Sequence, residues 1–426
     1  MMEEALWNPG DIAWMLTATA FVLFMTPGLA LFYGGMVRSK NVLSVLMQNF
    51  WCMGIITIVW IVAGYSIAFG GGGSPFLGGV DHLFLNGIAV DYGSAHLPEA
   101  VNVVFQLAFA VITPALITGA FAERMKFSAF AIFVAVWSLL VYSPLAHWVW
   151  DVGNGFLNKW GVLDFAGGTV IHVNAGVAAL VAAIIIGKRK GWPKPGFRPH
   201  NLTMTLLGTG ILWFGWMGFN AGSAGSASPQ AVNAFLVTQV SAATGAVVWA
   251  IVEWIKDGKP TTLGVASGGV AALVGITPAA GFVDVQSALI IGATCGVLCY
   301  FAIGLKSKLG YDDSLDVVGV HMVGGIIGGL LTGLLADAAI GGTAGGLAQM
   351  GKQAVGLGVG IVWSAVLTTI ILLAIKYTIG LRVTEEDEER GLDLSLHSEE
   401  GYSFAELGAT STASSLVTSS TSTSGG

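Results

Sequence analysis

The sequence predicts an all-α integral membrane protein with eleven transmembrane helices, and three observations support this prediction. Of its 426 residues, 54% are hydrophobic and only 10% are charged, which leaves too few charges to cover a soluble protein. Apolar stretches long enough to span a bilayer recur along the chain. The 61 glycines lie mostly within those stretches, where small residues let helices approach closely. We therefore expect a tightly packed bundle.

The expected spans follow one another from near the N-terminus to the start of an acidic tail. No strand-like alternation competes with them, and an open sheet cannot satisfy its backbone in lipid. The acidic start of the chain, residues 1–4, lacks the basic region of a signal peptide, so we expect the first span to be retained. The spans are expected at residues 12–34, 42–69, 100–121, 127–147, 167–187, 202–223, 231–255, 262–281, 285–305, 316–336 and 353–380.

Lysine and arginine collect in alternate loops, and this asymmetry predicts the orientation. The opposite loops hold only Lys159 and Lys352. We expect a multi-pass protein of the plasma membrane with its N-terminus outside and its C-terminus in the cytoplasm. The basic positions are Arg38, Lys40, Arg124, Lys126, the five between residues 188 and 198, Lys256, Lys259, Lys306, Lys308, Arg382 and Arg390.

One short pattern occurs twice. Asp164 precedes His172 by eight residues, and Asp313 precedes His321 by eight. The two patterns fall in the fifth and tenth spans, and units of five spans are inverted relative to each other, as in many transporters. At ~1.5 Å per residue, each histidine lies ~12 Å from its aspartate, near the middle of a ~30 Å hydrocarbon layer. We expect an inverted repeat of residues 12–187 and 202–336, followed by a long C-terminal helix at 353–380.

Ionisable side chains inside a membrane are costly, so His172 and His321 are candidates for function. Paired imidazoles can pass a proton or hydrogen-bond a small polar solute. Two alternatives remain open: each histidine bonds a backbone carbonyl, or the two are axial ligands of a haem. For Asp164, we favour a helix cap over a direct electrostatic contribution to a nearby cation site. Asp313 and Asp316 are expected to be solvated caps.

Aromatic side chains gather near the outer end of the sixth span. Trp216, Phe219 and Ser223 are three and four residues apart, so they share one helix face. Phe109 of the third span is expected at a comparable depth, and Trp150 ends the fourth span. Aromatic faces and a hydroxyl group can bind a monovalent cation. The alternative is an interfacial belt of aromatic residues.

No pattern typical of an enzyme stands out. We find no glycine-rich phosphate loop in a strand–helix context, no nucleophile elbow and no metal-ligand spacing. The three cysteines lie in apolar segments, which argues against a disulfide framework or a zinc site. We therefore expect no enzyme activity, no metal and no cofactor. Near two span ends, we expect Glu123 to be solvated or paired with Arg124, and Glu253 to be solvated or paired with Lys256.

The chain changes character after the last span. Residues 1–381 form the expected membrane domain, and residues 382–408 are acidic and mixed, which suggests a regulatory tail in the cytoplasm. Residues 409–426 are mostly Ser, Thr, Ala and Gly and are expected to be disordered. Because the acid is concentrated in the tail, the net charge of −7 says little about the membrane domain.

Several long motifs occur in order along the chain. They are Pro27–Asn41 (PGLALFYGGMVRSKN), Ala122–Ser128 (AERMKFS), Asp164–Gly176 (DFAGGTVIHVNAG), Gly218–Ser223 (GFNAGS) and Ile276–Gly281 (ITPAAG). Together they resemble the ammonium transporter family of Amt, Mep and Rh proteins, and the Amt branch in particular. The resemblance covers residues 10–402.

The resemblance implies a homotrimer of eleven-helix protomers, each with a narrow hydrophobic pore. The acidic tail of this chain, from residue 382, also resembles the family's cytoplasmic region, which takes part in regulation by PII signalling proteins. One departure is Met322, where a small residue is common. The implied roles are a recruitment site of Phe109, Trp150 and Ser223, a gate of Phe109 and Phe219, a pore lined by Trp216, His172 and His321, and Asp164 near the recruitment site.

These observations predict an ammonium transporter. A bare cation in a dry pore is far less tolerable than neutral ammonia, so we expect ammonium to be captured, deprotonated and conducted as ammonia. We expect the released proton to cross separately through the histidines, so that transport moves net charge. The alternatives are an ammonium sensor and a passive channel for ammonia or another small neutral gas.

Overall fold

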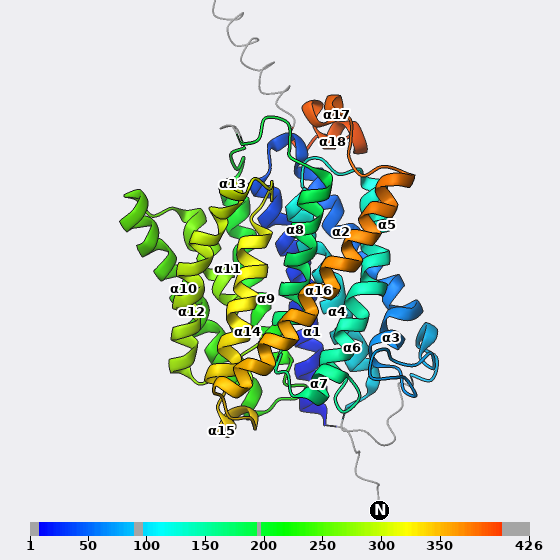
Figure 1. Ribbon diagram of the computed structural model, residues 1–426, viewed down its shortest axis with the longest axis vertical. Helices are drawn as coiled ribbons and strands as arrows, with labels where there is room; N and C mark the ends of the chain where they lie inside the picture. Colours follow the sequence, from blue (N-terminus) through cyan, green and yellow to red (C-terminus); the bar gives the residue numbers. More distant parts are fainter. Residues whose placement is uncertain (1–7, 89–96, 194–196, 403–426) are drawn as a thin grey trace, which may run out of the picture.

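Helices are the main secondary structure in the part of the chain that the computed structural model describes, which is residues 8–88, 97–193 and 197–402. The β-pairing in this part is limited to two isolated bridges, Ser74 with Leu77 and Met125 with Arg382. Ten of its helices are long and apolar enough to cross a membrane. The prediction of an all-α membrane protein is therefore confirmed (Figure 1). The expected disordered end, residues 409–426, lies outside the described residues.

Six spans are single helices, and four contain a π-helical segment, in which the hydrogen-bonded turn is one residue wider than in an α-helix. The single helices are α1 (Pro9–Met36), α4 (Glu99–Phe121), α9 (Leu202–Gly222), α10 (Pro229–Asp257), α12 (Val285–Ile303) and α16 (Leu347–Thr378). The interrupted spans are α2, η2 and α3 (Val42–Val59, Trp60–Gly64, Tyr65–Phe69), α5, η4 and α6 (Phe127–Trp137, Ser138–Tyr142, Ser143–Trp150), η5 and α8 (Gly168–Val173, Asn174–Ile186), and η6 and α14 (Val318–Met322, Val323–Leu335).

The eighth expected span is shorter than the sequence indicated. Helix α11 covers Thr262–Ile276 rather than 262–281. Pro278 has no N–H to donate to the carbonyl four residues earlier, so the ladder stops there and the chain continues in turns. With only 15 residues, α11 falls below the length of the ten spanning helices.

Close contact between α1 and α9 holds the first helices of the two expected repeats together. A Cβ atom on Gly208 would lie 2.3 Å from the backbone nitrogen of Phe32, and one on Gly28 would lie 2.6 Å from the side chain of Ile211. Only glycine fits at such distances, which explains part of the glycine content. The long helix α16 runs obliquely across the bundle (Figure 1) and packs on α8, α14 and α5.

The short helices α17 (Glu385–Arg390) and α18 (Leu392–His397) lie at one end of the bundle, together with α13 (Leu305–Leu309) (Figure 1). We call this end the tail face, and the end where α1 begins the opposite face. The carboxylate of Asp393 accepts hydrogen bonds from the backbone N–H groups of Leu43 and Ser44 at 3.0 and 2.7 Å, so it caps the start of α2. The tail is thereby fixed to the membrane domain.

A buried ion network joins the loops of the tail face. Glu123 is 2% exposed and pairs with Arg38 and Arg189 at 2.9 and 3.2 Å, and Arg189 also pairs with Asp312 at 2.8 Å. Burial raises the pKa of Glu123, but the guanidinium groups of Arg189 and Arg38 outweigh burial and hold it below its ordinary value. The two arginines therefore keep the side chain of Glu123 ionised although it is buried.

Glu123, expected to be solvated or paired with Arg124, is neither, and Glu253 is partly exposed but does not pair with Lys256. Glu123 has a φ of 73°, so the chain turns there, and Arg124 instead donates to the carbonyl oxygens of Gly187 and Asp312. Glu253 accepts hydrogen bonds from the backbone N–H and the hydroxyl group of Thr261, at 2.7 and 3.1 Å. It therefore holds the residue that caps α11.

Candidate functional site

The rings of His172 and His321 lie in direct contact inside the bundle. Their Nδ1 atoms are 3.2 Å apart, and the rings are nearly parallel, with an interplanar angle of 21°. Both side chains are buried, with 1% and 4% exposure. The haem alternative does not fit this geometry, because nitrogens in contact leave no space for a metal between them. The carbonyl alternative does not fit either, since among the described residues no hydrogen bond joins a ring nitrogen of the pair to a backbone carbonyl.

Each histidine lies in a π-helical segment that begins a span. Asp164 precedes η5 and accepts four backbone N–H groups, those of Gly167, Gly168, Thr169 and Val170, at 2.5 to 3.1 Å. It therefore caps this segment, as its position suggested. These four bonds fix the first turn of η5 and with it the height of His172 in the bundle.

The second pattern begins differently. Asp313 accepts one backbone N–H, that of Val318, at 2.7 Å. Our expectation that Asp313 is a solvated cap is wrong in one respect, because it is 1% exposed. Burial, the largest influence, raises its pKa to about 6, although Lys306 acts in the opposite direction. Asp316 does not cap η6, and its backbone has a φ of 64°.

Tight helix contacts set the distance between the two histidine segments. A Cβ atom on Gly176 would lie 2.4 Å from the backbone nitrogen of Met322, and one on Gly325 would lie 2.9 Å from the carbonyl oxygen of Gly168. The side chain of Met322 packs on an apolar cluster that includes Val173. The larger residue at position 322 is thus accommodated by apolar packing.

Aromatic rings in contact form a continuous row from the histidines toward the opposite face. The ring of His172 lies parallel to Trp216, with 5.4 Å between ring centroids, and to Phe219 at 6.1 Å. Phe219 meets Phe109 at 4.4 Å, and Phe109 meets Trp150 edge-on at 5.9 Å. The structure therefore brings together all four aromatic residues singled out in the sequence.

Beyond the aromatic pair lies a cavity of about 310 Å³ at the opposite face. We call it the Trp150 cavity. Its lining includes Phe109, Trp150, Asp164 and Ser223. The indole N–H of Trp150 donates to the backbone oxygen of Asp164 at 2.9 Å, which fixes the ring beside the cavity. The hydroxyl group of Ser223 donates to the carbonyl oxygen of Phe219, so its oxygen lone pairs remain available to a donor in the cavity.

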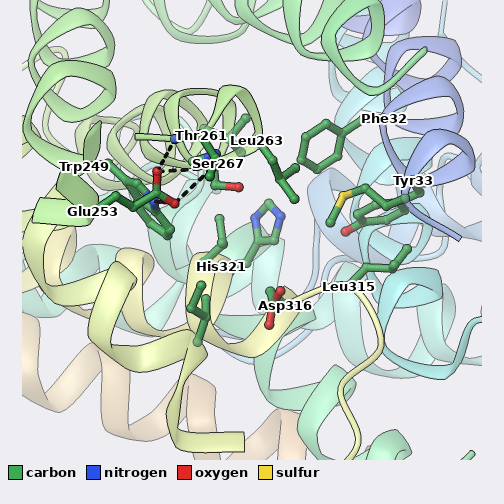
Figure 2. Close-up of a pocket in the computed structure, with 15 residues that line it drawn as sticks. Phe32, Tyr33, Trp249, Glu253, Thr261, Leu263, Ser267, Leu315, Asp316 and His321 are labelled. Carbon is green, nitrogen blue, oxygen red and sulfur yellow. Dashed lines mark hydrogen bonds between the residues drawn. The ribbon is translucent and has the colours of Figure 1, made fainter. Parts of the chain in front are cut away.

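A second cavity, of about 100 Å³, lies at the tail face, where α1 ends and α11 begins. We call it the Asp316 cavity. Figure 2 shows the imidazole of His321 near its centre, with Phe32 and Tyr33 on one side and Trp249 and Glu253 on the other. Ser267 and Asp316 also line it. The histidine pair thus separates two cavities at opposite ends of the bundle.

The hydrogen bonding of the pair defines its chemistry. A neutral imidazole carries one N–H, so an Nδ1···Nδ1 bond requires one ring to be protonated at Nδ1 and the other at Nε2. The pair then offers one Nε2 acceptor and one Nε2–H donor. Nε2 of His172 is buried with no hydrogen-bond partner among the described residues. A small solute that both donates and accepts matches these groups.

Some parts of the arrangement have no signal in the sequence. Thr277 accepts the indole N–H of Trp216 at 2.8 Å and so orients that ring. Phe105 lies edge-on to Phe109 at 4.8 Å between ring centroids and extends the row of aromatic rings. Residue spacing on one helix does not reveal partners on other helices. The one available hint for Phe105 is its position four residues before Phe109 on the same helix face.

Comparison with known proteins agrees with the motifs. The model of the Ammonium Transporter Family matches residues 13–402. Proteins named ammonium transporter from Aquifex aeolicus and Mycobacterium tuberculosis are 49% and 48% identical to this chain, over 94% and 93% of it and 95% and 91% of their own lengths. The crystal structure of Saccharomyces cerevisiae Mep2 is 36% identical, with a TM-score of 0.84 over 89% of this chain and 88% of its own. This chain therefore belongs to the ammonium transporter family.

Proposed function

We propose that this protein moves ammonium across the plasma membrane, by capturing the cation in the Trp150 cavity and conducting ammonia past the histidine pair. The observation that carries the proposal is the direct contact of His172 and His321 between two cavities, behind the contacting rings of Phe109 and Phe219. A polar pair in an enclosed apolar place suits a small neutral solute that donates and accepts hydrogen bonds. Ammonia has both capacities.

Capture uses groups that replace water around a cation. The rings of Trp150 and Phe109 supply aromatic faces, and Ser223 supplies oxygen lone pairs. Asp164 adds negative charge without direct contact, because its oxygens already accept four backbone N–H groups. The Trp150 cavity therefore stabilises the charged ammonium ion before it loses a proton.

Deprotonation precedes passage because the interior offers no compensation for a bare charge. The residues between the cavities are apolar or neutral, and a monovalent cation moved there loses its hydration. Ammonium escapes this cost by giving up a proton, whereas potassium has none to give. The contacting rings of Phe109 and Phe219 act as a gate, and Trp216 lines the pore below them. The proton follows separately through the histidine pair, so the overall transport moves charge.

We extend the proposal to the orientation of the protein, its domains, its assembly and its partner. The tail face is cytoplasmic, since basic residues concentrate in its loops. Residues 1–381 form the transport domain, with inverted repeats at about 12–187 and 202–336, and residues 382–408 regulate it. Three copies assemble, each with its own pore, and a PII signalling protein is the expected partner at the tail. No enzymatic step and no cofactor is needed.

A flux measurement tests this function. The purified protein is placed in vesicles that contain a pH-sensitive dye, and ammonium is added outside. We expect saturable, protein-dependent pH changes well above those of protein-free vesicles. A protein that binds ammonium with no flux above that background is instead a sensor.

A further inference from the structure

Residues 162–165 form part of the wall of the Trp150 cavity, and they belong to no helix. We call them the wall segment. They lie between α7 (Phe156–Trp160) and η5, and they include Asp164. Backbone groups in such an enclosed, irregular segment still need hydrogen-bond partners, which must come from other parts of the protein. The position of the wall therefore depends on those partners.

The side chain of Gln353, on α16, binds both backbone groups of Leu163. Its Oε1 atom accepts the N–H of Leu163 at 2.7 Å, and its Nε2 group donates to the carbonyl oxygen of Leu163 at 2.5 Å. The same Nε2 group also donates to the carbonyl oxygen of Gly329 on α14 at 3.3 Å. Among the described residues, no other group bonds the backbone of Leu163. Gln353 is 2% exposed, so water has little access to these bonds.

A second position of α16 contacts the wall segment. A Cβ atom on Gly356 would lie 2.8 Å from a methyl carbon of Val162, which is closer than side chains pack. Gly356 stands three residues after Gln353, so the two positions share one helix face. This helix lies outside both expected repeats, yet one of its faces sets the position of the wall segment by a polar and an apolar contact.

The wall segment in turn holds the indole ring of the cavity. The carbonyl oxygen of Asp164 accepts the indole N–H of Trp150 at 2.9 Å. The carbonyl group of Leu163 and the nitrogen of Asp164 belong to one planar peptide group, so the bond from Gln353 restricts the backbone of Asp164 directly. The ring of Trp150 therefore rests on a backbone that Gln353 fixes.

We propose that Gln353 is a positioning residue for cation capture, which holds Leu163 and Asp164 where the ring of Trp150 faces the captured ion. This inference rests on the proposed function. Gln353 does not line the cavity, so it acts through the wall segment and not by contact with the ion. A site that is already in place loses little freedom on binding, whereas a loosened wall must be ordered by the ion. The loss then falls on affinity, because the gate and the histidine pair are unaltered.

Two substitutions on α16 perturb the wall segment in different ways. Gln353→Met has a side chain of similar length that lacks the N–H donor and the carbonyl acceptor, so Leu163 loses both partners. Gly356→Ala removes no hydrogen bond but displaces Val162, and alanine favours a helix more than glycine does. If Gln353→Met does not fold, Gly356→Ala alone decides the question.

Gln349→Met is the matched control. Gln349 lies one turn before Gln353 on the same helix face, is 6% exposed, and donates to the carbonyl oxygen of Gly161 at 2.7 Å. Gly161 is not part of the cavity lining. The control therefore loses a buried amide hydrogen bond of the same kind, and its melting temperature should fall about as much as that of Gln353→Met.

Flux is measured in vesicles sorted so that the opposite face points outward, by the protection of an affinity tag at the C-terminal end. We expect Gln353→Met to raise the half-saturating ammonium concentration roughly tenfold, the size of one lost buried hydrogen bond, with less than a twofold change in maximal flux. Gly356→Ala should raise it as well, and Gln349→Met should change it less than twofold. An unchanged value in folded Gln353→Met, or an equal rise in Gln349→Met, overturns the positioning role.

A combination with Trp150→Phe tests the route. That substitution keeps an aromatic face but lacks the N–H that bonds Asp164. If Gln353 acts through this bond, adding Gln353→Met to Trp150→Phe should raise the half-saturating concentration by less than about threefold further. A further rise as large as in the wild-type background contradicts the route through Trp150. Absence of flux in the wild type contradicts the proposed function itself, so the failures are distinct.

Discussion

Nδ1 of His172 lies 3.2 Å from Nδ1 of His321, although the two residues are 149 positions apart in the chain. This contact makes the pair a single unit that shares one proton between the rings. It also fixes where the remaining donor and acceptor point.

Replacing both histidines with alanine tests whether the pair conducts. We expect ammonium flux to fall at least tenfold, or potassium to pass as well, because the hydrogen-bond donor and acceptor that the pair offers between the two cavities are lost. The measurement is flux of ammonium and of potassium in vesicles. His82→Ala is the control, since His82 lies in the loop before α4. Unchanged flux and selectivity would show that the pair is structural.

The aromatic gate makes a separate prediction. Phe219→Ala removes the ring that contacts Phe109 at 4.4 Å and creates a path for water. We expect a potassium-dependent current in this variant and none in the wild type, while ammonium flux continues. Phe214→Ala is a matched control on the same helix, because Phe214 is half exposed and packs on Phe21. Potassium exclusion that survives Phe219→Ala would argue against a gate at this position.

Two substitutions of Asp164 distinguish its role as a helix cap from the effect of its negative charge. Asp164→Ala leaves four buried N–H groups without an acceptor, so we expect a loss of about 2 kcal/mol or more in the free energy of unfolding. Asp164→Asn keeps one oxygen and should lose less stability, while the negative charge is removed. Thermal unfolding in detergent measures the first effect, and the ammonium concentration for half-maximal flux measures the second. Equal stability of the two variants would contradict a capping role.

The ion network at the tail face predicts acid sensitivity. The pKa values of Glu123 and Asp312 are below their ordinary values, because nearby arginines outweigh the effect of burial. Folding then gains stability from these carboxylates above their unfolded pKa values of ~4, and the gain is lost as pH falls through the lower folded values. Glu123→Gln should reduce the slope of stability against pH in this acid range.

The same network predicts a large cost for losing one partner. Glu123→Ala leaves Arg38 and Arg189 without a shared carboxylate, and we expect a destabilisation of ~3–5 kcal/mol. Glu385→Ala is the control: Glu385 pairs with Lys190 on the surface, where solvent screens the interaction, so its melting temperature should hardly change. Similar melting temperatures for both variants would show that the buried network adds little.

Hydropathy alone predicted most of the fold. Long apolar runs must cross the membrane as helices, so the bounds of α2 to α3 and of α9 agree with expectation within a residue or two. The end of α11 did not follow hydropathy, because Pro278 stops the helix inside an apolar run. The π-helical segments at both histidines depend on contacts between helices and have no sequence signal.

The sequence predicted those parts of the site that depend on spacing within one helix or on the repeated pattern. Spacing on one helix placed Trp216, Phe219 and Ser223 together, and the repeated pattern paired the histidines. Contacts between distant loops were beyond such reasoning. The burial of Asp313, the partners of Glu123 and the left-handed backbone of Asp316 each depend on how separate loops meet at the tail face.

An electrical measurement shows directly whether transport of ammonium moves charge. Vesicles containing the wild-type protein are adsorbed to a solid-supported membrane and pulsed with ammonium or potassium. If ammonium is deprotonated at the Trp150 cavity and its proton crosses separately through the histidine pair, ammonium evokes a saturable transient current. Potassium evokes none, and the variant lacking both histidines loses the ammonium current. Ammonia flux without any current would contradict this account and indicate a passive channel for the neutral gas.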